Sequence, residues 1–107
     1  MKIMQGDSRR IPIEITQDNM TITPYMLADV EVCVGENVRK AYSNGDVTFD
    51  ESTGFWYIRL TQEETFGMDG TQEVIVRVKY KNKPYADVIG YKAGIINAAD
   101  TISREVL

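Results

Sequence analysis

The residue types that most often carry acid–base and metal chemistry are scarce in this 107-residue sequence. It contains no histidine, the commonest general base and the commonest ligand of transition metals. Its single cysteine, Cys33, stands between two valines of an expected strand and has no imidazole to activate it. We interpret Cys33 as a small, partly buried side chain with no catalytic role.

Two pairs of neighbouring carboxylates are the remaining candidates for catalysis. Asp50-Glu51 and Glu63-Glu64 each supply the two acids that glycoside hydrolysis uses. The first pair lies among turn-forming residues, and the second contains the glutamate of a helix-capping sequence, so both have local structural explanations. The spacing of Asp46, Asp50 and Glu51 matches no known calcium loop. The sequence therefore predicts a protein that is not an enzyme and that uses no cofactor and no metal.

Charge and hydropathy narrow the classes of partner. The formal net charge is −4, and the basic residues are scattered singly or in pairs such as Arg9-Arg10, whereas a phosphate backbone requires a concentrated basic face. Apolar runs such as 94–96 are far shorter than the ~20 residues that cross a bilayer. A single cysteine forms no intrachain disulfide, which suits assembly in a reducing cytoplasm. We expect neither nucleic acid nor a membrane as the partner.

Strand patterns separated by turn sequences run through most of the chain. Apolar and polar residues alternate over 11–15, 30–34 and 72–80, which is the period-two pattern of half-buried strands. Pro12 in the first segment cannot donate a ladder hydrogen bond, so we place that strand at a sheet edge. Further strands are expected over residues 38–42, 47–49, 55–60 and 85–91.

These elements predict an all-β fold with one short helical turn near residues 61–66, where Thr61 and Glu64 form a capping box. About seven strands with turns every ten or so residues are typical of an immunoglobulin-like antiparallel β-sandwich, which we assign to residues 1–96. Residues 97–107 are expected to form a C-terminal arm or a short helix, because their apolar residues fit both helix-like spacing and an extended segment.

Aromatic residues are the main candidates for binding. The six tyrosines, together with Phe55 and Trp56, exceed what the core of a small sandwich needs, and tyrosine is enriched at protein interfaces. If Ile58 and Leu60 face inward, alternation along the strand places Trp56 inside with them and Phe55 and Tyr57 outside; the sequence leaves open which of the two faces is buried. The expected interface residues are Phe55, Tyr57, Ile102, Val106 and Leu107.

Several short segments follow one another in a characteristic order. In chain order they are Gly6-Asp7 followed by residues 10–13, residues 27–31, Thr53-Gly54 followed by residues 56–60, residues 60–65, Gly70 followed by residues 72–79, and residues 102–107. Residues 60–65 are the tightest match. In this order and spacing, the chain resembles the immunoglobulin-like N-terminal domain of phage baseplate upper proteins and the short stand-alone phage proteins similar to it. The resemblance covers nearly the whole chain.

The resemblance implies a structural component of a tailed-phage or prophage tail, assembled in the bacterial host cytoplasm and located in the virion. Its partners would be other tail or baseplate proteins, and it would associate with further copies of itself. Baseplate upper proteins usually continue into a linker and a segment that holds the receptor-binding protein. The residues of this sequence do not match those parts, so the expectation is limited to assembly into the particle.

A carbohydrate-binding β-sandwich module is the alternative interpretation of the aromatic residues. Aromatic faces stack on sugar rings, and neighbouring acidic groups accept hydrogen bonds from the sugar hydroxyls. In that case the platform would consist of Phe55, Tyr57, Tyr85 and Tyr91.

Overall fold

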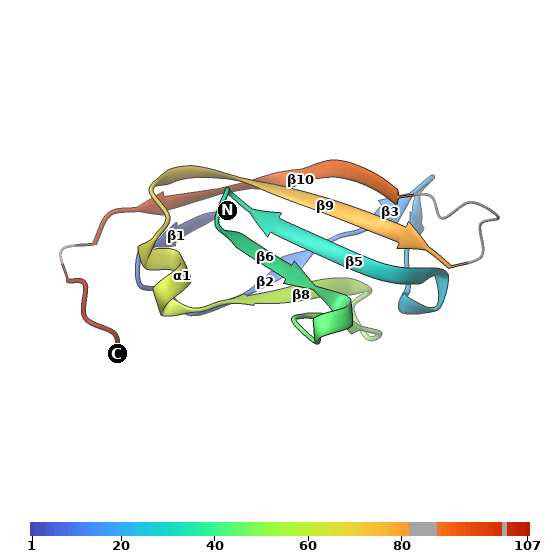
Figure 1. Cartoon of the computed structure of the whole chain (residues 1–107), viewed down its shortest axis with the longest axis horizontal. Helices are drawn as coiled ribbons and strands as arrows, with labels where there is room; N and C mark the ends of the chain where they lie inside the picture. The colour runs from blue at the N-terminus through green and yellow to red at the C-terminus, as the bar shows by residue number, and fades with distance from the viewer. Residues whose placement is uncertain (82–87, 102) are drawn as a thin grey trace.

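The computed structural model describes residues 1–81, 88–101 and 103–107, and these residues are mostly in β-strands (Figure 1). The all-β class is therefore confirmed. The strands are β1 Lys2–Met4, β2 Arg9–Ile13, β3 Thr16–Gln17, β4 Met20–Thr21, β5 Leu27–Val34, β6 Val38–Ala41, β7 Val47–Asp50, β8 Phe55–Leu60, β9 Gly70–Tyr80 and β10 Val88–Ala99. The helical elements are η1 Pro24–Met26, η2 Tyr42–Asn44 and α1 Gln62–Phe66.

Two sheets enclose the core, and the β9–β10 ladder lies in a different layer from β8 (Figure 1). The larger sheet has the strand order β1-β10-β9-β5-β6, and the smaller has the order β2-β8-β7. A separate two-stranded ladder joins β3 to β4. Neighbouring strands are antiparallel except β1 and β10, which run parallel. The chain thus crosses repeatedly between the two sheets.

Alternate side chains of both sheets point into one hydrophobic core, as the period-two patterns predicted. Trp56, Ile58 and Leu60 of β8 are buried, which confirms the predicted inner face of that strand. The matching core residues of the larger sheet are Val30, Val32 and Val34 of β5 and Val74, Val76 and Val78 of β9. The two sheets are therefore held together by aliphatic side chains around one tryptophan.

Trp56 is the largest fully buried side chain, and it is held by both packing and a hydrogen bond. Its indole Nε1–H donates to the carbonyl oxygen of Ile22 at 2.9 Å, which ties β8 to the segment that follows β4. The rings of Tyr42 and Phe49 lie 5.6 and 5.0 Å from the Trp56 ring, measured between centroids. Aromatic packing therefore extends from the core to the surface near η2 and β7.

The capping box predicted at the start of α1 is present, and α1 also fixes the turn between β1 and β2. The buried Thr65 hydroxyl accepts the backbone N–H of Gly6 at 2.9 Å and donates to the carbonyl oxygen of Asp7 at 2.8 Å. Gly6 has φ +89°, and the ring of Phe66 lies so near that a β-carbon on Gly6 would be 2.8 Å from it. One short helix thus joins the first and second strands to β8.

The end of the chain differs from the prediction. The last strand runs from Val88 to Ala99 instead of ending near residue 91, and residues 82–87 lie outside the described part. A register shift between Lys92 and Gly94 interrupts the alternation, which hid the second half of β10 in the sequence. Ala98 and its two neighbours pair with β1, so strand structure continues across the expected boundary between residues 96 and 97. Residues 100–101 and 103–107 adopt no regular secondary structure, and the helical alternative does not form in them.

Candidate functional site

Phe55 and Tyr57 lie together on the outer face of the smaller sheet and are half-buried. In the ladder, Tyr57 stands between Pro12 of β2 and Thr48 of β7. The Tyr57 hydroxyl is 3.4 Å from Oγ1 of Thr53, which fixes the end of the ring. We call the surface formed by Arg10, Pro12, Phe55, Tyr57 and Arg59 the outer β8 face.

Two arginines flank the tyrosine on the outer β8 face. Arg10 and Arg59 are directly opposite each other in the β2–β8 ladder, and both are exposed. The guanidinium carbon of Arg10 lies 3.6 Å from the centroid of the Tyr57 ring, a cation–π contact. Within the described residues neither arginine forms an ion pair. Among the described residues, the outer β8 face therefore carries two arginines without an ion-pair partner beside two aromatic rings.

A hollow of about 340 Å³ adjoins the two arginines and reaches the edge of the larger sheet. Lys40 of β6 lines the same hollow, but its ammonium group is 2.8 Å from Glu64 of α1 and is already paired. These three cations are far apart in the sequence, so no local cluster of basic residues marks them as neighbours. Only the packing of β2, β6 and β8 brings them together.

A second, larger hollow of about 720 Å³ lies between η1 and β7. Tyr25 and Tyr42 line it, and Tyr25 is 77% exposed, an unusually high value for a large aromatic side chain. Thr48 and Glu51 add a hydroxyl and a carboxylate to the same hollow. This arrangement was missed because neither tyrosine belongs to the strand with the strongest β pattern.

The platform predicted for sugar binding is not assembled by the described residues. Phe55 and Tyr57 lie on the outer β8 face, whereas Tyr91 of β10 packs against the hydrophobic core. Tyr85 lies outside the described residues. Tyr25 and Tyr42 are two other aromatic side chains of the described part, and they line one hollow.

The C-terminal residues extend beyond α1 at one end of the molecule (Figure 1). Val106 and Leu107 are 61% and 104% exposed, while Ile102 lies outside the described residues. Arg104 holds this segment, because its guanidinium donates to Oε1 of Gln5 at 3.1 Å and to the carbonyl oxygen of Phe66 at 2.9 Å. The segment is thus anchored near its middle, with its last two apolar side chains facing solvent.

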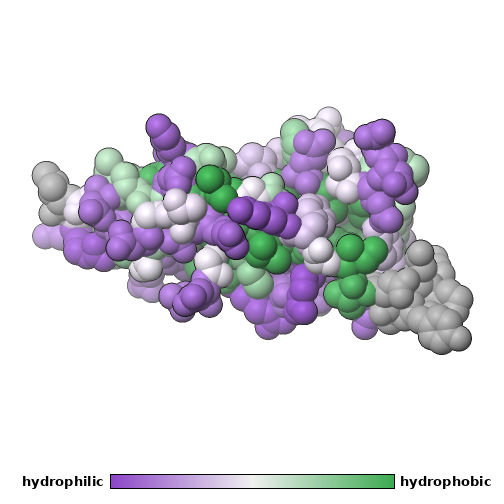
Figure 2. Space-filling view, turned by 90° about the horizontal axis from the view of Figure 1, so that it is seen from above, coloured by the Kyte–Doolittle hydropathy of each residue, from purple (hydrophilic) through white to green (hydrophobic). Residues whose placement is uncertain are grey.

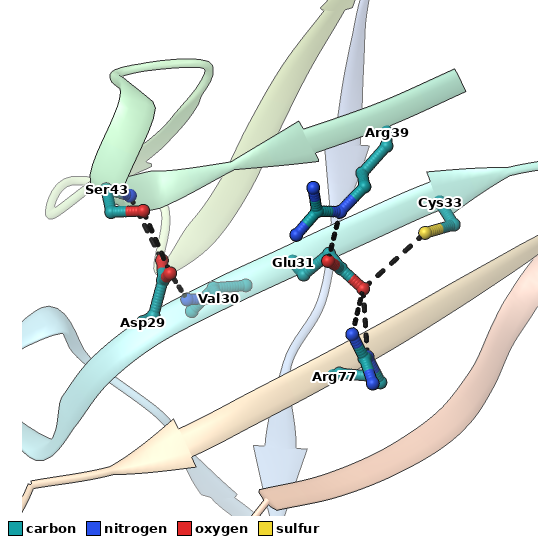
Figure 3. Close-up of polar contacts among 7 residues, drawn as sticks. All are labelled: Asp29, Val30, Glu31, Cys33, Arg39, Ser43 and Arg77. Carbon is teal, nitrogen blue, oxygen red and sulfur yellow. Dashed lines mark hydrogen bonds and ion pairs between the residues drawn. The ribbon is translucent and has the colours of Figure 1, made fainter. Parts of the chain in front are cut away.

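Figure 2 shows the molecule from above the view of Figure 1. On this face, apolar and hydrophilic residues are intermixed. On the outer face of the larger sheet, Glu31 of β5 forms ion pairs with both Arg39 of β6 and Arg77 of β9 (Figure 3). The hydrogen bond from Arg39 is the main reason that the pKa of Glu31 is lowered. Burial, followed by the charge of Glu31, raises the pKa of the neighbouring Cys33 thiol. This cluster joins three strands and keeps the thiol protonated.

Lowering the pH should weaken this cluster in a defined direction. Because the folded-state pKa of Glu31 is below its ordinary value of 4.5, the ion pairs stabilise the fold above that pH. Their contribution is lost as the pH falls through the lower, folded-state pKa. We therefore expect the difference in the free energy of unfolding between the natural chain and Glu31→Gln to be constant near neutral pH and to shrink below pH 4.5. Urea titrations at several pH values measure this difference in the free energy of unfolding, and Glu36→Gln, at an exposed position, is the control. A difference for Glu31→Gln that does not change with pH contradicts the prediction.

One member of each acidic pair has a local structural partner. The Asp50 carboxylate accepts hydrogen bonds from the backbone N–H and the hydroxyl of Ser52, at 2.9 and 2.7 Å, and these bonds lower its pKa. Glu64 accepts the N–H of Thr61 in the capping box and pairs with Lys40. Among the described residues, no group of three or more carboxylate or thiol side chains is placed to hold a metal ion.

No protein-family model matches the sequence, and neither a curated protein nor a solved structure matches the chain. The described part of the chain has no helix with the length and apolar character needed to cross a membrane.

Proposed function

We propose that this chain is a non-enzymatic structural module of a tailed-phage or prophage tail that works through protein–protein contacts. Its partners are other tail or baseplate proteins and further copies of itself, and its place is the tail of the virion after assembly in the host cytoplasm. The observation that carries the proposal is the outer β8 face, where Phe55, Tyr57 and two arginines share one exposed sheet surface. Tyrosine and arginine are enriched in the residues that dominate binding energy at interfaces.

We also propose that the sandwich is of the immunoglobulin-like type. The order β2-β8-β7 corresponds to strands B-E-D of that fold, and β10-β9-β5-β6 corresponds to G-F-C-C′, with the same chain order. The position of the tryptophan is a departure, since antibody domains bury theirs on strand C whereas Trp56 lies on β8. The strand order supports the proposal, and the tryptophan makes this a variant of the fold.

The edges of both sheets add a second source of contact energy. Among the described strands, β6 ends the larger sheet, and β2 and β7 end the smaller one, so each presents one unpaired edge. Backbone groups at such edges form hydrogen bonds with strands of another chain. β2 and β7 flank β8, so a partner seated on the outer β8 face also reaches these edges, and the exposed Val106 and Leu107 add apolar contact at the end of the molecule.

Replacing both Phe55 and Tyr57 by serine should abolish most of the association. Hot-spot side chains contribute about 2 kcal/mol or more each, so the loss of both, where the two effects add, raises the dissociation constant by roughly 700-fold. Light scattering measures this, with the purified chain alone and mixed with the proteins encoded beside its gene. Tyr25→Ser is the control, because it removes a more exposed aromatic ring that is not part of the outer β8 face. A chain that stays monomeric and indifferent to every neighbour contradicts the proposal.

A carbohydrate-binding module is the second candidate, favoured by the hollow of Tyr25 and Tyr42. The edge contact between Tyr42 and Trp56 fixes one ring, and Thr48 and Glu51 supply groups that hydrogen-bond sugar hydroxyls. The two candidates respond oppositely to the same variants. If the hollow binds sugar, Tyr25→Ser eliminates the retardation of the chain in polysaccharide-containing gels, and the Phe55 and Tyr57 double variant leaves it unchanged.

A further inference from the structure

The positions of Arg10 and Arg59 conflict with the rules of strand pairing. Like charges directly opposite each other on one face of an antiparallel ladder destabilise the sheet, because their β-carbons are only about 4.5–5.5 Å apart. Elsewhere the chain pairs its charges across strands: Glu31 neutralises Arg39 and Arg77 on the larger sheet. On the outer β8 face no described carboxylate lies within ion-pair distance of either arginine. The fold therefore tolerates a local repulsion that a bound anionic group would relieve.

The local geometry suits a carboxylate. Arginine presents a planar set of donors that matches a carboxylate in two parallel hydrogen bonds. Arg10 is held in place by its contact with the Tyr57 ring, so less side-chain freedom is lost when its donors are used. The adjoining hollow of about 340 Å³ provides room beside the guanidinium groups for a side chain that enters from outside.

The surroundings disfavour a long polyanion such as nucleic acid. Asp46 lines the same hollow, and the charge of Arg10 contributes to lowering the pKa of Asp50, so two carboxylates lie in the neighbourhood of the arginines. Lys40, the third cation of the hollow, is paired with Glu64. The chain as a whole carries a net charge of −4, which repels extended negative backbones at long range. Two cations in an acidic setting favour one or two carboxylates over a row of phosphates.

We propose that Arg10 and Arg59 form a binding site for aspartate or glutamate side chains of a protein segment that lies across β8. This rests on the proposed function, because it takes the outer β8 face to be the surface that meets a protein partner. It adds the chemistry of that partner: an acidic segment whose carboxylates contact the two guanidinium groups while its apolar atoms pack on Phe55 and Tyr57.

The test uses the full chain and two labelled peptides of equal length, one rich in glutamate and one in which every glutamate is glutamine. Fluorescence anisotropy should show binding of the glutamate peptide only, and the affinity should fall as salt rises, since exposed charge pairs are screened. The double variant Arg10→Gln/Arg59→Gln should bind it at least roughly 10-fold more weakly, because each charged hydrogen bond contributes about 1.5–3 kcal/mol. Arg39→Gln makes the same chemical change on the opposite sheet and should leave the affinity unchanged.

A second measurement separates a binding role from a structural one. Because Arg10→Gln/Arg59→Gln removes a repulsion, we expect that variant to unfold at the same or a higher urea concentration than the natural chain. Lower stability combined with unchanged peptide affinity overturns the proposal. So does equal binding of the two peptides, no binding of either, or tighter binding of a single-stranded oligonucleotide or of inorganic phosphate than of the glutamate peptide.

The outcomes also distinguish this site from the wider assembly proposal. If the glutamate peptide fails to bind but serine at positions 55 and 57 still disrupts association, the carboxylate site is wrong and the assembly surface stands. If the peptide binds through Arg10 and Arg59 while the chain associates with nothing in light scattering, the assembly proposal is wrong and the site stands.

Discussion

Replacing Trp56 by alanine is expected to lower the free energy of unfolding by about 3–5 kcal/mol, a large fraction of the roughly 5–15 kcal/mol that stabilises a typical domain. The indole is fully buried at the centre of the core, and its loss leaves a cavity that the rigid strands of both sheets cannot close. It also leaves the carbonyl oxygen of Ile22 without its 2.9 Å hydrogen bond. Urea denaturation followed by far-ultraviolet circular dichroism measures this, since the variant has no tryptophan to report on folding.

Trp56→Phe separates the two contributions to this loss of unfolding free energy, the packing of the indole and its hydrogen bond to Ile22. The phenyl ring retains part of the contact with Tyr42 and Phe49 but cannot donate to Ile22. We expect an intermediate loss of about 1–3 kcal/mol, from the unpaired carbonyl and the reduced packing. If Trp56→Ala unfolds at the urea concentration of the natural chain, the central role given to this residue is wrong.

Replacing Thr65 by valine is expected to cost about 2–4 kcal/mol, although the two side chains have nearly the same shape. The hydroxyl of Thr65 is buried, and it bonds the N–H of Gly6 and the carbonyl oxygen of Asp7. Each buried backbone group left without a partner costs about 1–3 kcal/mol. The turn between β1 and β2 should loosen first, so hydrogen exchange of the Gly6 amide should accelerate more than that of the amides in β9.

Thr71→Val is the matched control for this prediction. Thr71 is exposed, and its hydroxyl bonds only the side chain of Asn97, at 2.9 Å, where water can replace the lost partner. We expect a change within about 0.5 kcal/mol, as for most surface substitutions. Equal losses in Thr65→Val and Thr71→Val would show that the buried hydroxyl contributes nothing beyond a surface one.

Most of the strand pattern was predictable because burial on one face imposes alternation on the sequence. The period-two patterns of β5 and β9 and the capping box of α1 were identified from their spacing alone, whereas the spacing in β8 showed only that Trp56, Ile58 and Leu60 share one face. The short strands β1, β3 and β4 were missed, because two or three residues cannot display a period. The predicted last strand ended too early, because the register shift in β10 breaks the period-two pattern in the middle of the strand.

The surface residues were predictable only in part. Alternation placed Phe55 and Tyr57 outside, and the structure has them half-buried on the outer face. Arg10 and Arg59 are separated by almost half the chain, and no local pattern marks them as neighbours. Their pairing depends on the register of β2 against β8, which shared burial of Ile11 and Ile58 fixes across the sheet.

The sequence by itself determined the class of fold, the inner and outer faces of the main strands and the start of the short helix. These features depend on neighbours in the chain, because side-chain direction alternates along a strand and a helix cap spans only four residues. Tertiary structure alone decided which strands are adjacent, and therefore that two arginines without an ion-pair partner in the described part stand opposite each other beside Tyr57 and that Tyr25 and Tyr42 line one hollow. Those contacts join residues far apart in the chain, so they follow from the packing of the whole core and from no single segment.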